Sequence, residues 1–237
     1  MKTFTYSDLY KNKNWKSKFN KEQLREIRKG IINNENISLY AKDYFNYKQM
    51  KVIRLGLLKN VDVSLYAKPS YDEKQMSEIL EGLVKKINIH LYLNPKFSAE
   101  QMKLIREGID EFSESKVILY ADPMFKLPHM KEIIKGLREG LDVSLYAKGK
   151  TSVAQMREIR KGLEQGLDVS LYKSKKFDET QMSEIRKGLE KGLDVSSYAK
   201  FELDWFDMAT IRWKLEDEML NRKVFKNEEK EEKETKY

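Results

Sequence analysis

The sequence predicts an all-α solenoid of about seven 26-residue repeats, each a helix, a turn and a short helix, with a cap at each end. Two recurrences predict it. An apolar residue near the start of each predicted helix returns every 26 residues, with one interval of 28, as Leu24, Met50, Met76, Met102, Met130, Met156, Met182 and Met208. A closing tyrosine returns in step, as Tyr40, Tyr66, Tyr92, Tyr120, Tyr146, Tyr172 and Tyr198. Self-similarity at a fixed period of about 20–50 residues is the signature of stacked repeats.

Residues 1–18 precede the first full repeat and are predicted to cap it. The segment Ser7-Asp8-Leu9-Tyr10 is similar to the Val-Ser-Leu-Tyr that ends later repeats, so we interpret it as half a repeat. Capping repeats are expected to be atypical, since one of their sides faces water. Residues 19–200 then form the repeat array.

Each helix of the array has a recognisable start. In six repeats an N-cap residue stands three positions before a glutamine, which is the spacing of a capping box. These residues are Asn20, Asn46, Asp72, Ser98, Ser152 and Asp178. Inside the helix, residues such as Met182, Ile185 and Leu189 lie on one apolar stripe, which is expected to face the core.

Glycine recurs at two places in the repeat. Gly140, Gly166 and Gly192 follow the long helix and suit its C′ position, and an Asp or Asn two residues later is expected to cap a short helix, Val-Ser-Leu-Tyr-Ala-Lys. A second glycine lies inside the long helix, as Gly30, Gly56, Gly82, Gly108, Gly136, Gly162 and Gly188. Glycine there costs about 1 kcal/mol relative to alanine. We therefore expect an aromatic residue or the short helix of the neighbouring repeat to pack closely against it.

Two segments depart from the repeat. The fourth turn, residues 110–116, is two residues longer and is expected to bend the array or to protrude as a contact. Residues 201–223 are predicted to form a C-terminal cap helix, and the charged residues 224–237 a helical extension or a disordered end. Trp15, Trp205 and Trp213 occur only in the terminal caps, where we expect them to seal the core. A dimer or partner interface is the alternative for Trp205 and Trp213.

The composition narrows the class of protein. Lys and Arg number 46 against 38 Asp and Glu, and the net charge of +8 favours acidic partners, nucleic acid included. The absence of cysteine excludes disulfides, cysteine-based zinc sites and thiol nucleophiles. No apolar run reaches the roughly 18 residues of a membrane span, and the first residues contain no apolar signal segment. We expect a cytoplasmic protein, in the cytoplasm of the host cell if a phage encodes it, with no membrane contact.

No catalytic constellation stands out, so the sequence predicts no enzyme activity, no cofactor and no metal site. His90 and His129 lie 39 residues apart, outside any metal-binding spacing. No glycine-rich phosphate loop occurs, because the glycines belong to the helices and their ends. A pocket with several perturbed carboxylates would be needed to support an enzyme.

Basic side chains recur on one flank of the predicted helices. Those at positions one and five after the aligned apolar residue are the predicted partner-binding residues: Arg25, Lys29, Lys51, Lys103, Lys131, Lys135, Arg157, Lys161 and Lys187. Those at position four border the apolar stripe and are either structural or partner-binding: Arg28, Arg54, Arg106, Arg160 and Arg186. Stacked repeats would align these side chains into a basic ribbon that suits phosphates or an acidic protein face. The third repeat interrupts the ribbon with Ser77, Leu80 and Glu81, which argues against a uniform nucleic-acid track.

The phrase Gln-Met-x-Glu-Ile-Arg-x-Gly-Leu-Glu-x-Gly-Leu-Asp-Val-Ser-x-Tyr-Ala-Lys, closest at residues 156–173 and 182–200, resembles a short repeat of bacterial phage and conjugative-element proteins. The resemblance covers residues 19 to about 200. It assigns no catalytic residue and no activity. What it implies is an accessory protein of a mobile element, and such proteins often block host defence.

The sequence and the resemblance together favour a non-enzymatic scaffold that binds a host protein or a nucleoprotein complex. A CRISPR effector is one such complex, which an anti-defence protein would block by steric docking. The alternative is a helical repeat protein that binds RNA or DNA directly through the basic ribbon. The identity of the partner and the oligomeric state stay open.

Overall fold

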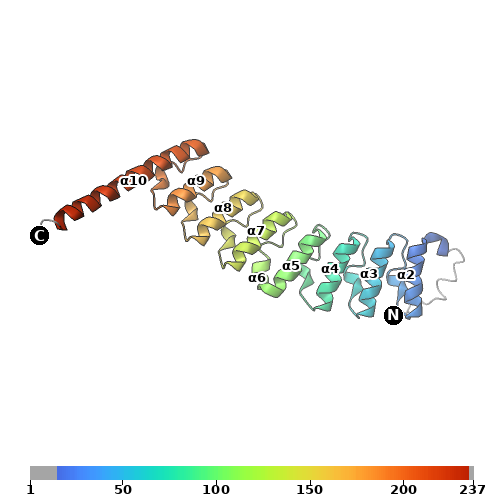
Figure 1. The fold of residues 1–237 in the computed structure, drawn as a ribbon. Helices are drawn as coiled ribbons and strands as arrows, with labels where there is room; N and C mark the ends of the chain where they lie inside the picture. The colour runs from blue at the N-terminus through green and yellow to red at the C-terminus, as the bar shows by residue number, and fades with distance from the viewer. Residues whose placement is uncertain (1–14, 235–237) are drawn as a thin grey trace. The chain divides into compact units, whose positions relative to one another are not determined.

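The computed structural model describes the backbone of residues 15–234 and the side chains of residues 16–224. Every regular element in this range is helical and no strand occurs within it, which confirms the predicted all-α class (Figure 1). Residues 1–14 of the expected N-terminal cap, and the side chain of Trp15, lie outside the described part. Residues Trp15–Lys18 form a short 3-10 helix, η1.

Long α-helices alternate with short helical turns along the chain. After η1 the elements are α2 (Lys21–Ile32), η2 (Ile37–Leu39), α3 (Tyr47–Leu58), η3 (Val63–Leu65), α4 (Glu73–Val84), η4 (Ile89–Leu91), α5 (Ala99–Glu111), α6 (Glu114–Val117), α7 (Leu127–Arg138), η5 (Val143–Leu145), α8 (Val153–Glu164), η6 (Val169–Leu171), α9 (Glu179–Glu190), η7 (Val195–Ser197) and α10 (Trp205–Glu234).

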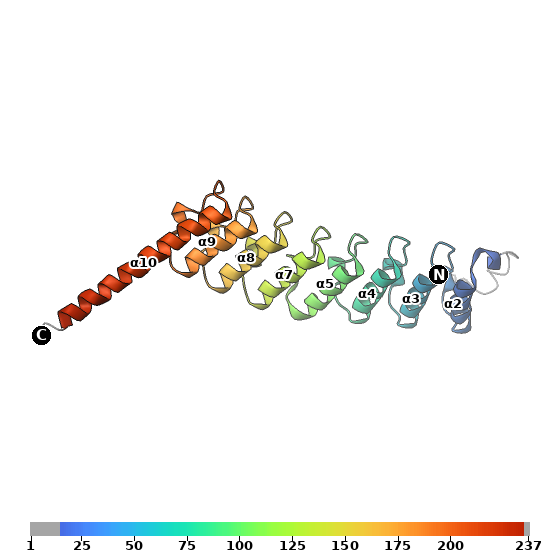
Figure 2. The ribbon, with the colours of Figure 1, turned by 45° about the horizontal axis from the view of Figure 1, so that its top comes forward.

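The chain divides into two compact units, an N-terminal half that ends at Leu127 and a C-terminal half that begins at Pro128. In the N-terminal half α2, α3, α4 and α5 pack in sequence order, each against the next. In the C-terminal half α8, α9 and α10 pack in the same way. Figure 1 and Figure 2 both show these consecutive helices side by side, so the predicted repeat packing is confirmed within each half.

The glutamine that completes each capping box also joins one repeat to the next. All six predicted capping boxes are present, with the two reciprocal hydrogen bonds that define them. The Nε2 of Gln49 also donates to the carbonyl oxygen of Tyr71 at 2.7 Å, and the Nε2 of Gln155 donates to that of Phe177 at 2.6 Å. The same side chain therefore starts one helix and holds the loop of the following repeat against it.

The closing tyrosines are fully buried, and each lies against the recurring glycine of its own long helix. A Cβ added at Gly188 would lie 1.8 Å from the Oη of Tyr198. The prediction of a close approach to this glycine is confirmed, but the prediction that the neighbouring repeat makes the contact was wrong. The repeat's own tyrosine fills the space, because the turn carries the chain back over the helix that precedes it.

The turns after six of the long helices contain one residue in the left-handed conformation. Gly140, Gly166 and Gly192 have positive φ as predicted, and in the N-terminal half the same conformation occurs at Asn34, Asn60 and Lys86. The short second helix is a single 3-10 turn of three residues in most repeats, shorter than predicted, because the tyrosine that follows has already left helical φ and ψ.

The side chain before this turn caps it in most repeats. The caps that accept a backbone N–H are Asp62, Asn88, Asp142, Asp168 and Asp194. The expected cap at Asn36 makes no such bond, and its Oδ1 accepts instead from the hydroxyl of Ser38 at 2.6 Å.

The two irregular segments are helical. The longer fourth turn forms α6, with Ser113 in the N-cap position, in place of the 3-10 turn of other repeats. The last helix, α10, extends from Trp205 to Glu234, past the predicted end near Lys223. Of the two possibilities for the charged tail, the helical extension therefore holds up to Glu234.

Candidate interaction surfaces

The arginines at position four of the repeat join neighbouring helices. All except Arg28 donate from Nε to a glutamate of the preceding repeat, 28 residues earlier. The pairs are Arg54–Glu26 at 3.0 Å, Arg106–Glu78 at 2.9 Å, Arg160–Glu132 at 2.6 Å, Arg186–Glu158 at 2.8 Å and Arg212–Glu184 at 2.9 Å. These arginines are buried or nearly so. Of the two roles left open for them, the geometry therefore favours the structural one.

Arg28 differs from the other arginines of this position. Its helix, α2, is the first long helix of the described chain, and its side chain is exposed. No ion pair of Arg28 occurs within the described residues, so it stays a candidate binding residue.

The lysines at position five contact the same glutamates. Lys29, Lys135, Lys161 and Lys187 each lie three residues after the glutamate of their own helix, with Nζ–O distances of 2.6, 3.7, 2.7 and 2.5 Å. Burial acts to raise the pKa of Glu158, but the hydrogen bonds and charges of Lys161 and Arg186 outweigh it, so the pKa lies below its ordinary value. Each of these glutamates thus holds two cations, a lysine of its own helix and an arginine of the next.

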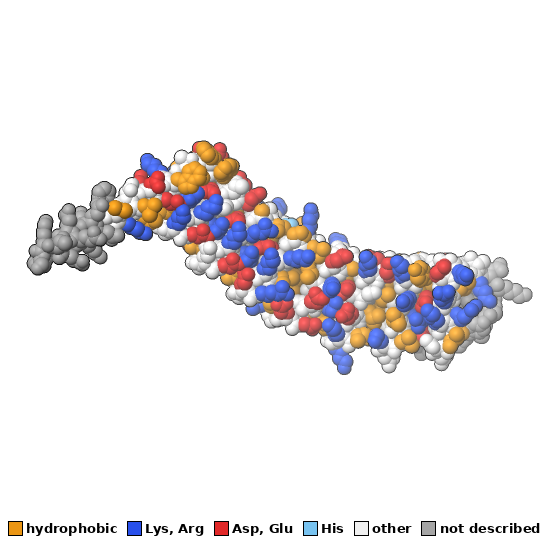
Figure 3. Space-filling view, viewed as in Figure 1, with side chains coloured by type: hydrophobic (Ala, Val, Ile, Leu, Met, Phe, Trp, Pro, Cys, Tyr) orange, Lys and Arg blue, Asp and Glu red, His pale blue; other side chains and the backbone are white. Residues whose placement is uncertain are grey.

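The basic residues at position one form the fewest ion pairs among the predicted binding residues. The exposed ones without an ion pair in the described chain are Arg25, Lys51, Lys131 and Arg157. Lys103 reaches Glu107 only at 3.8 Å. Figure 3 shows Lys and Arg interspersed with Asp and Glu over the C-terminal half, which is a mixed surface rather than a ribbon of one sign.

The interruption in the third repeat has a structural reason. Leu80 is buried where other repeats have the paired arginine, and Val52 of the preceding helix is equally buried where they have the glutamate. Glu81 replaces the lysine and forms a salt bridge with Nη1 of Arg106 at 3.0 Å. An apolar pair and a reversed charge thus follow from the packing of neighbouring repeats.

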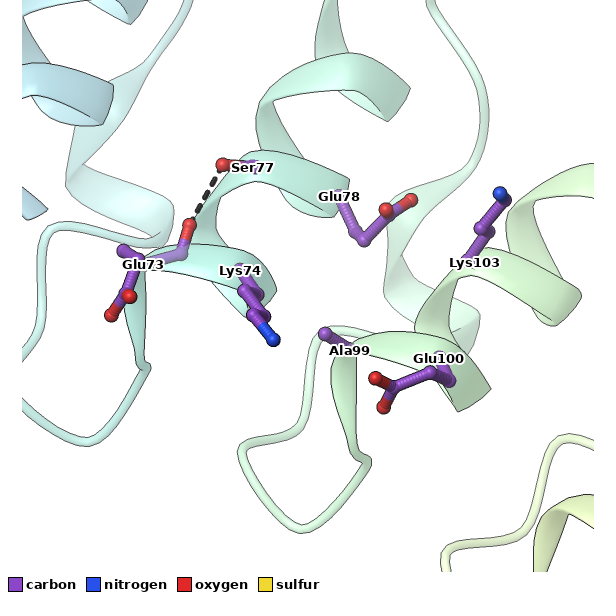
Figure 4. A pocket seen from close by; sticks show the side chains of 7 residues that line it. All are labelled: Glu73, Lys74, Ser77, Glu78, Ala99, Glu100 and Lys103. Carbon is purple, nitrogen blue, oxygen red and sulfur yellow. Dashed lines mark hydrogen bonds between the residues drawn. The ribbon is translucent and has the colours of Figure 1, made fainter. Parts of the chain in front are cut away.

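A shallow cavity of about 300 Å³ lies between α4 and α5 in the N-terminal half. Its lining mixes both charges, as Glu73, Lys74, Ser77, Glu78, Ala99, Glu100 and Lys103 (Figure 4). The hydroxyl of Ser77 donates to the carbonyl oxygen of Glu73 at 2.7 Å rather than to a base, so nothing activates it as a nucleophile. This arrangement supports no reaction.

Other site chemistry is sparse in the part of the chain that the structure describes. No group of three or more His, Cys, Asp or Glu side chains there is placed to hold a metal ion. His90 is exposed and His129 is half-buried, in different halves of the chain. Among the described helices none combines the length and apolar character needed to cross a membrane.

The last helix exposes large apolar side chains that the repeats do not. Phe206, Trp213, Leu220 and Val224, which we call the α10 stripe, are each about half exposed. Their spacing of seven, seven and four residues places them along one line of the helix. Figure 3 shows an apolar patch over the beginning of α10.

The expectation that Trp205 and Trp213 seal the core was wrong, since each is also about half exposed. The side of α10 that packs on α9 carries Met208 and Arg212 instead, and both are buried. In the N-terminal half, Ile118 and Met124 near the irregular fourth turn are exposed as well.

No protein-family model, no curated protein and no solved structure matches this chain.

Proposed function

We propose that this protein is a non-enzymatic scaffold that binds a protein partner through the α10 stripe. The observation that carries the proposal is the exposure of Phe206 and Trp213 on a helix whose opposite side is fixed to α9. Large aromatic residues are enriched in protein interfaces and among the few residues that dominate binding free energy. From Phe206 to Val224 the stripe is about 27 Å long, at about 1.5 Å per residue, which suits a helix or a groove of a partner.

The resemblance to repeats of phage and mobile-element proteins suggests the class of partner. A host defence complex would be blocked when the scaffold occupies the surface that the complex needs for its own target. Ile118 and Met124 offer a second apolar contact in the N-terminal half.

Direct binding of RNA or DNA through the helix flank is the weaker candidate. Counterion release requires cations that are free to meet phosphates. The lysines at position five are already paired with glutamates, which leaves Arg25, Arg28, Lys51, Lys131 and Arg157 as the unpaired members of the predicted ribbon in the described chain.

A capture experiment tests the scaffold. The tagged full chain is incubated with a bacterial lysate, with and without nuclease, beside the variant Phe206→Glu/Trp213→Glu. Leu58→Glu serves as the matched control, because Leu58 is also about half exposed but lies in the N-terminal half. The proposal expects a protein partner that survives nuclease, is lost with the double variant and is kept by the control.

Two results contradict the proposal. One is a protein partner that the double variant retains as well as the wild type, while circular dichroism shows both folded. The other is recovery of nucleic acid alone, which disappears on digestion and would favour the direct RNA- or DNA-binding alternative.

A further inference from the structure

A second cavity lies in the C-terminal half, between the loops that follow Tyr146 and Tyr172. Its volume is about 480 Å³, within the size range of small-molecule sites. Its lining contains four lysines, three hydroxyl side chains and no carboxylate: Leu145, Lys148, Gly149, Lys150, Thr151, Ser170, Lys173, Ser174 and Lys175.

The cavity exists because one repeat lacks a large residue that most others have. In five other repeats the residue before the first helical turn is buried and aromatic, as Phe45, Tyr71, Phe97, Phe125 and Phe177. In this repeat it is Thr151. Phe177 packs on Phe201 of the following loop, with ring centroids 4.7 Å apart. One repeat earlier the equivalent residues are Thr151 and Lys175, and the space between their loops is left open.

Gly149 opens the loop further. A Cβ added there would meet no atom within 4 Å, so the residue presents bare backbone at the cavity. The absence of a side chain at Gly149 and the small side chain of Thr151 together make room for a ligand beside the lysines.

Most of the positive charge of the cavity is not compensated by nearby carboxylates of the described chain. Asp168, which accepts a hydrogen bond from the backbone N–H of Ser170, acts electrostatically on Lys173 without forming an ion pair with it. None of Lys148, Lys150, Lys173 and Lys175 has an ion pair within the described residues, in contrast to the lysines of the helix flank. Ammonium groups gathered around one opening repel one another, and a bound anion relieves that repulsion. Hydroxyl and ammonium donors together match the many acceptor oxygens of a phosphate group.

We propose that this cavity binds the phosphate groups of a polyanionic ligand. A single carboxylate would balance one of four ammonium charges, whereas linked phosphates balance several. The site is separate from the α10 stripe and does not depend on the partner that the stripe binds.

The test uses inorganic pyrophosphate as the probe, titrated into the full chain at low salt. The backbone amide of Gly149 is followed by NMR and the affinity is measured by calorimetry. We expect a saturable shift at Gly149 and a loss of affinity of about tenfold or more in Lys148→Gln/Lys150→Gln. The control is Lys68→Gln/Lys96→Gln, which removes the same charge from the equivalent loop positions beside the aromatic residues Tyr71 and Phe97.

Thr151→Phe tests whether the open space is needed as well as the positive charge. This variant restores the aromatic residue of the other repeats and keeps all four lysines, so it should fold and yet bind pyrophosphate at least tenfold more weakly, roughly as the lysine variant does. Three results would each overturn the proposal. They are wild-type affinity for pyrophosphate in Thr151→Phe, a loss of affinity in the Lys68→Gln/Lys96→Gln control as large as in the lysine variant, and no saturable shift at Gly149 in the wild type. Given binding, displacement of pyrophosphate by a short oligothymidylate assigns the site to nucleic-acid phosphodiesters, and its failure assigns the site to free phosphate esters.

Discussion

Arg54 of α3 donates from Nε to Oε2 of Glu26 in α2 at 3.0 Å, and both side chains are less than a tenth exposed. At the next junction the equivalent positions hold Leu80 and Val52, also buried. At every junction within either half, these two positions therefore hold either a glutamate and an arginine or two apolar residues. A buried charge without its partner is strongly unfavourable, whereas an apolar pair of similar volume is tolerated.

The first prediction exchanges one kind of pair for the other. Arg54→Leu leaves Glu26 with Lys29 alone and also removes the cation beside the buried carboxylate of Glu35, so we expect the free energy of unfolding to fall by about 2–4 kcal/mol. Adding Glu26→Val recreates the pair that Val52 and Leu80 form, but Glu35, whose carboxylate lies 3.6 Å from Nη1 of Arg54 in the wild type, stays without that cation. The double variant should therefore regain part of the loss, and a further Glu35→Val, which copies Val61 of the next repeat, should bring the protein to within about 1 kcal/mol of the wild type. Urea unfolding measures all of these variants. Losses that simply add would show that the two side chains are not coupled.

The second prediction concerns acid. Burial acts to raise the pKa of Glu26, but Lys29 and Arg54 outweigh it, so the folded-state pKa lies below the ordinary value of 4.5. A lowered carboxyl pKa contributes stability above the unfolded-state value and loses it as the pH falls below about 4.5. We expect the free energy of unfolding to decrease between about pH 5 and about pH 3, and to decrease less in Glu26→Val/Arg54→Leu. Equal pH dependence in the two proteins would argue against this role of Glu26.

The start and stop signals of the helices were predictable because they are local. An N-cap such as Asn46 and its glutamine lie three residues apart, and a turn glycine such as Gly166 needs only its own φ. The second bond of Gln49, to Tyr71, was not predicted, since it depends on how one repeat meets the next.

The basic ribbon was overestimated for the same reason. The helical positions of Lys161 and Arg160 place both on one flank of α8, but they do not show the partners. Lys161 pairs with Glu158, which lies at another angle around the same helix, and Arg160 pairs with Glu132 of α7. The sequence did hold a signal. Where position two of one repeat is glutamate, position four of the next is arginine, and where it is apolar, as at Val52, position four is apolar too.

The exposure of Trp213 could not be predicted from periodicity. A stripe of apolar residues does not reveal which side of the last helix has a neighbour. Trp213 stands at the position that holds lysine in repeats such as the one with Lys187, and that departure from the repeat was the available clue.

The third prediction tests the double role of the capping glutamine. Glutamate also completes a capping box, so the local rule predicts no penalty for Gln49→Glu. The structure predicts a loss of about 1–3 kcal/mol, because the donor to the carbonyl oxygen of Tyr71 disappears and a buried carboxylate faces that oxygen. The penalty, measured against the wild type at each pH by urea unfolding, should shrink in acid, where the carboxyl group is protonated and can donate. A variant as stable as the wild type at neutral pH would assign Gln49 to the capping box alone.

The fourth prediction concerns the glycine and tyrosine of each repeat. Alanine favours a helix over glycine by about 1 kcal/mol, so Gly188→Ala should stabilise α9 if nothing opposed it. The added Cβ would lie 1.8 Å from the Oη of Tyr198, which is fully buried. We therefore expect a net loss of about 1–3 kcal/mol.

Tyr198→Phe removes the oxygen that meets this Cβ and leaves Cζ at 3.1 Å as the nearest atom of the ring. Its cost is small, because the hydroxyl lies 3.5 Å from the carbonyl oxygen of Glu184, at the limit of a hydrogen bond. Gly188→Ala/Tyr198→Phe should therefore be more stable than Gly188→Ala, as measured by thermal and urea unfolding. If the double variant is the less stable of the two, the hydroxyl is not what requires glycine at this position, and the requirement must come from Val195, whose Cγ1 would lie 3.0 Å from the same Cβ.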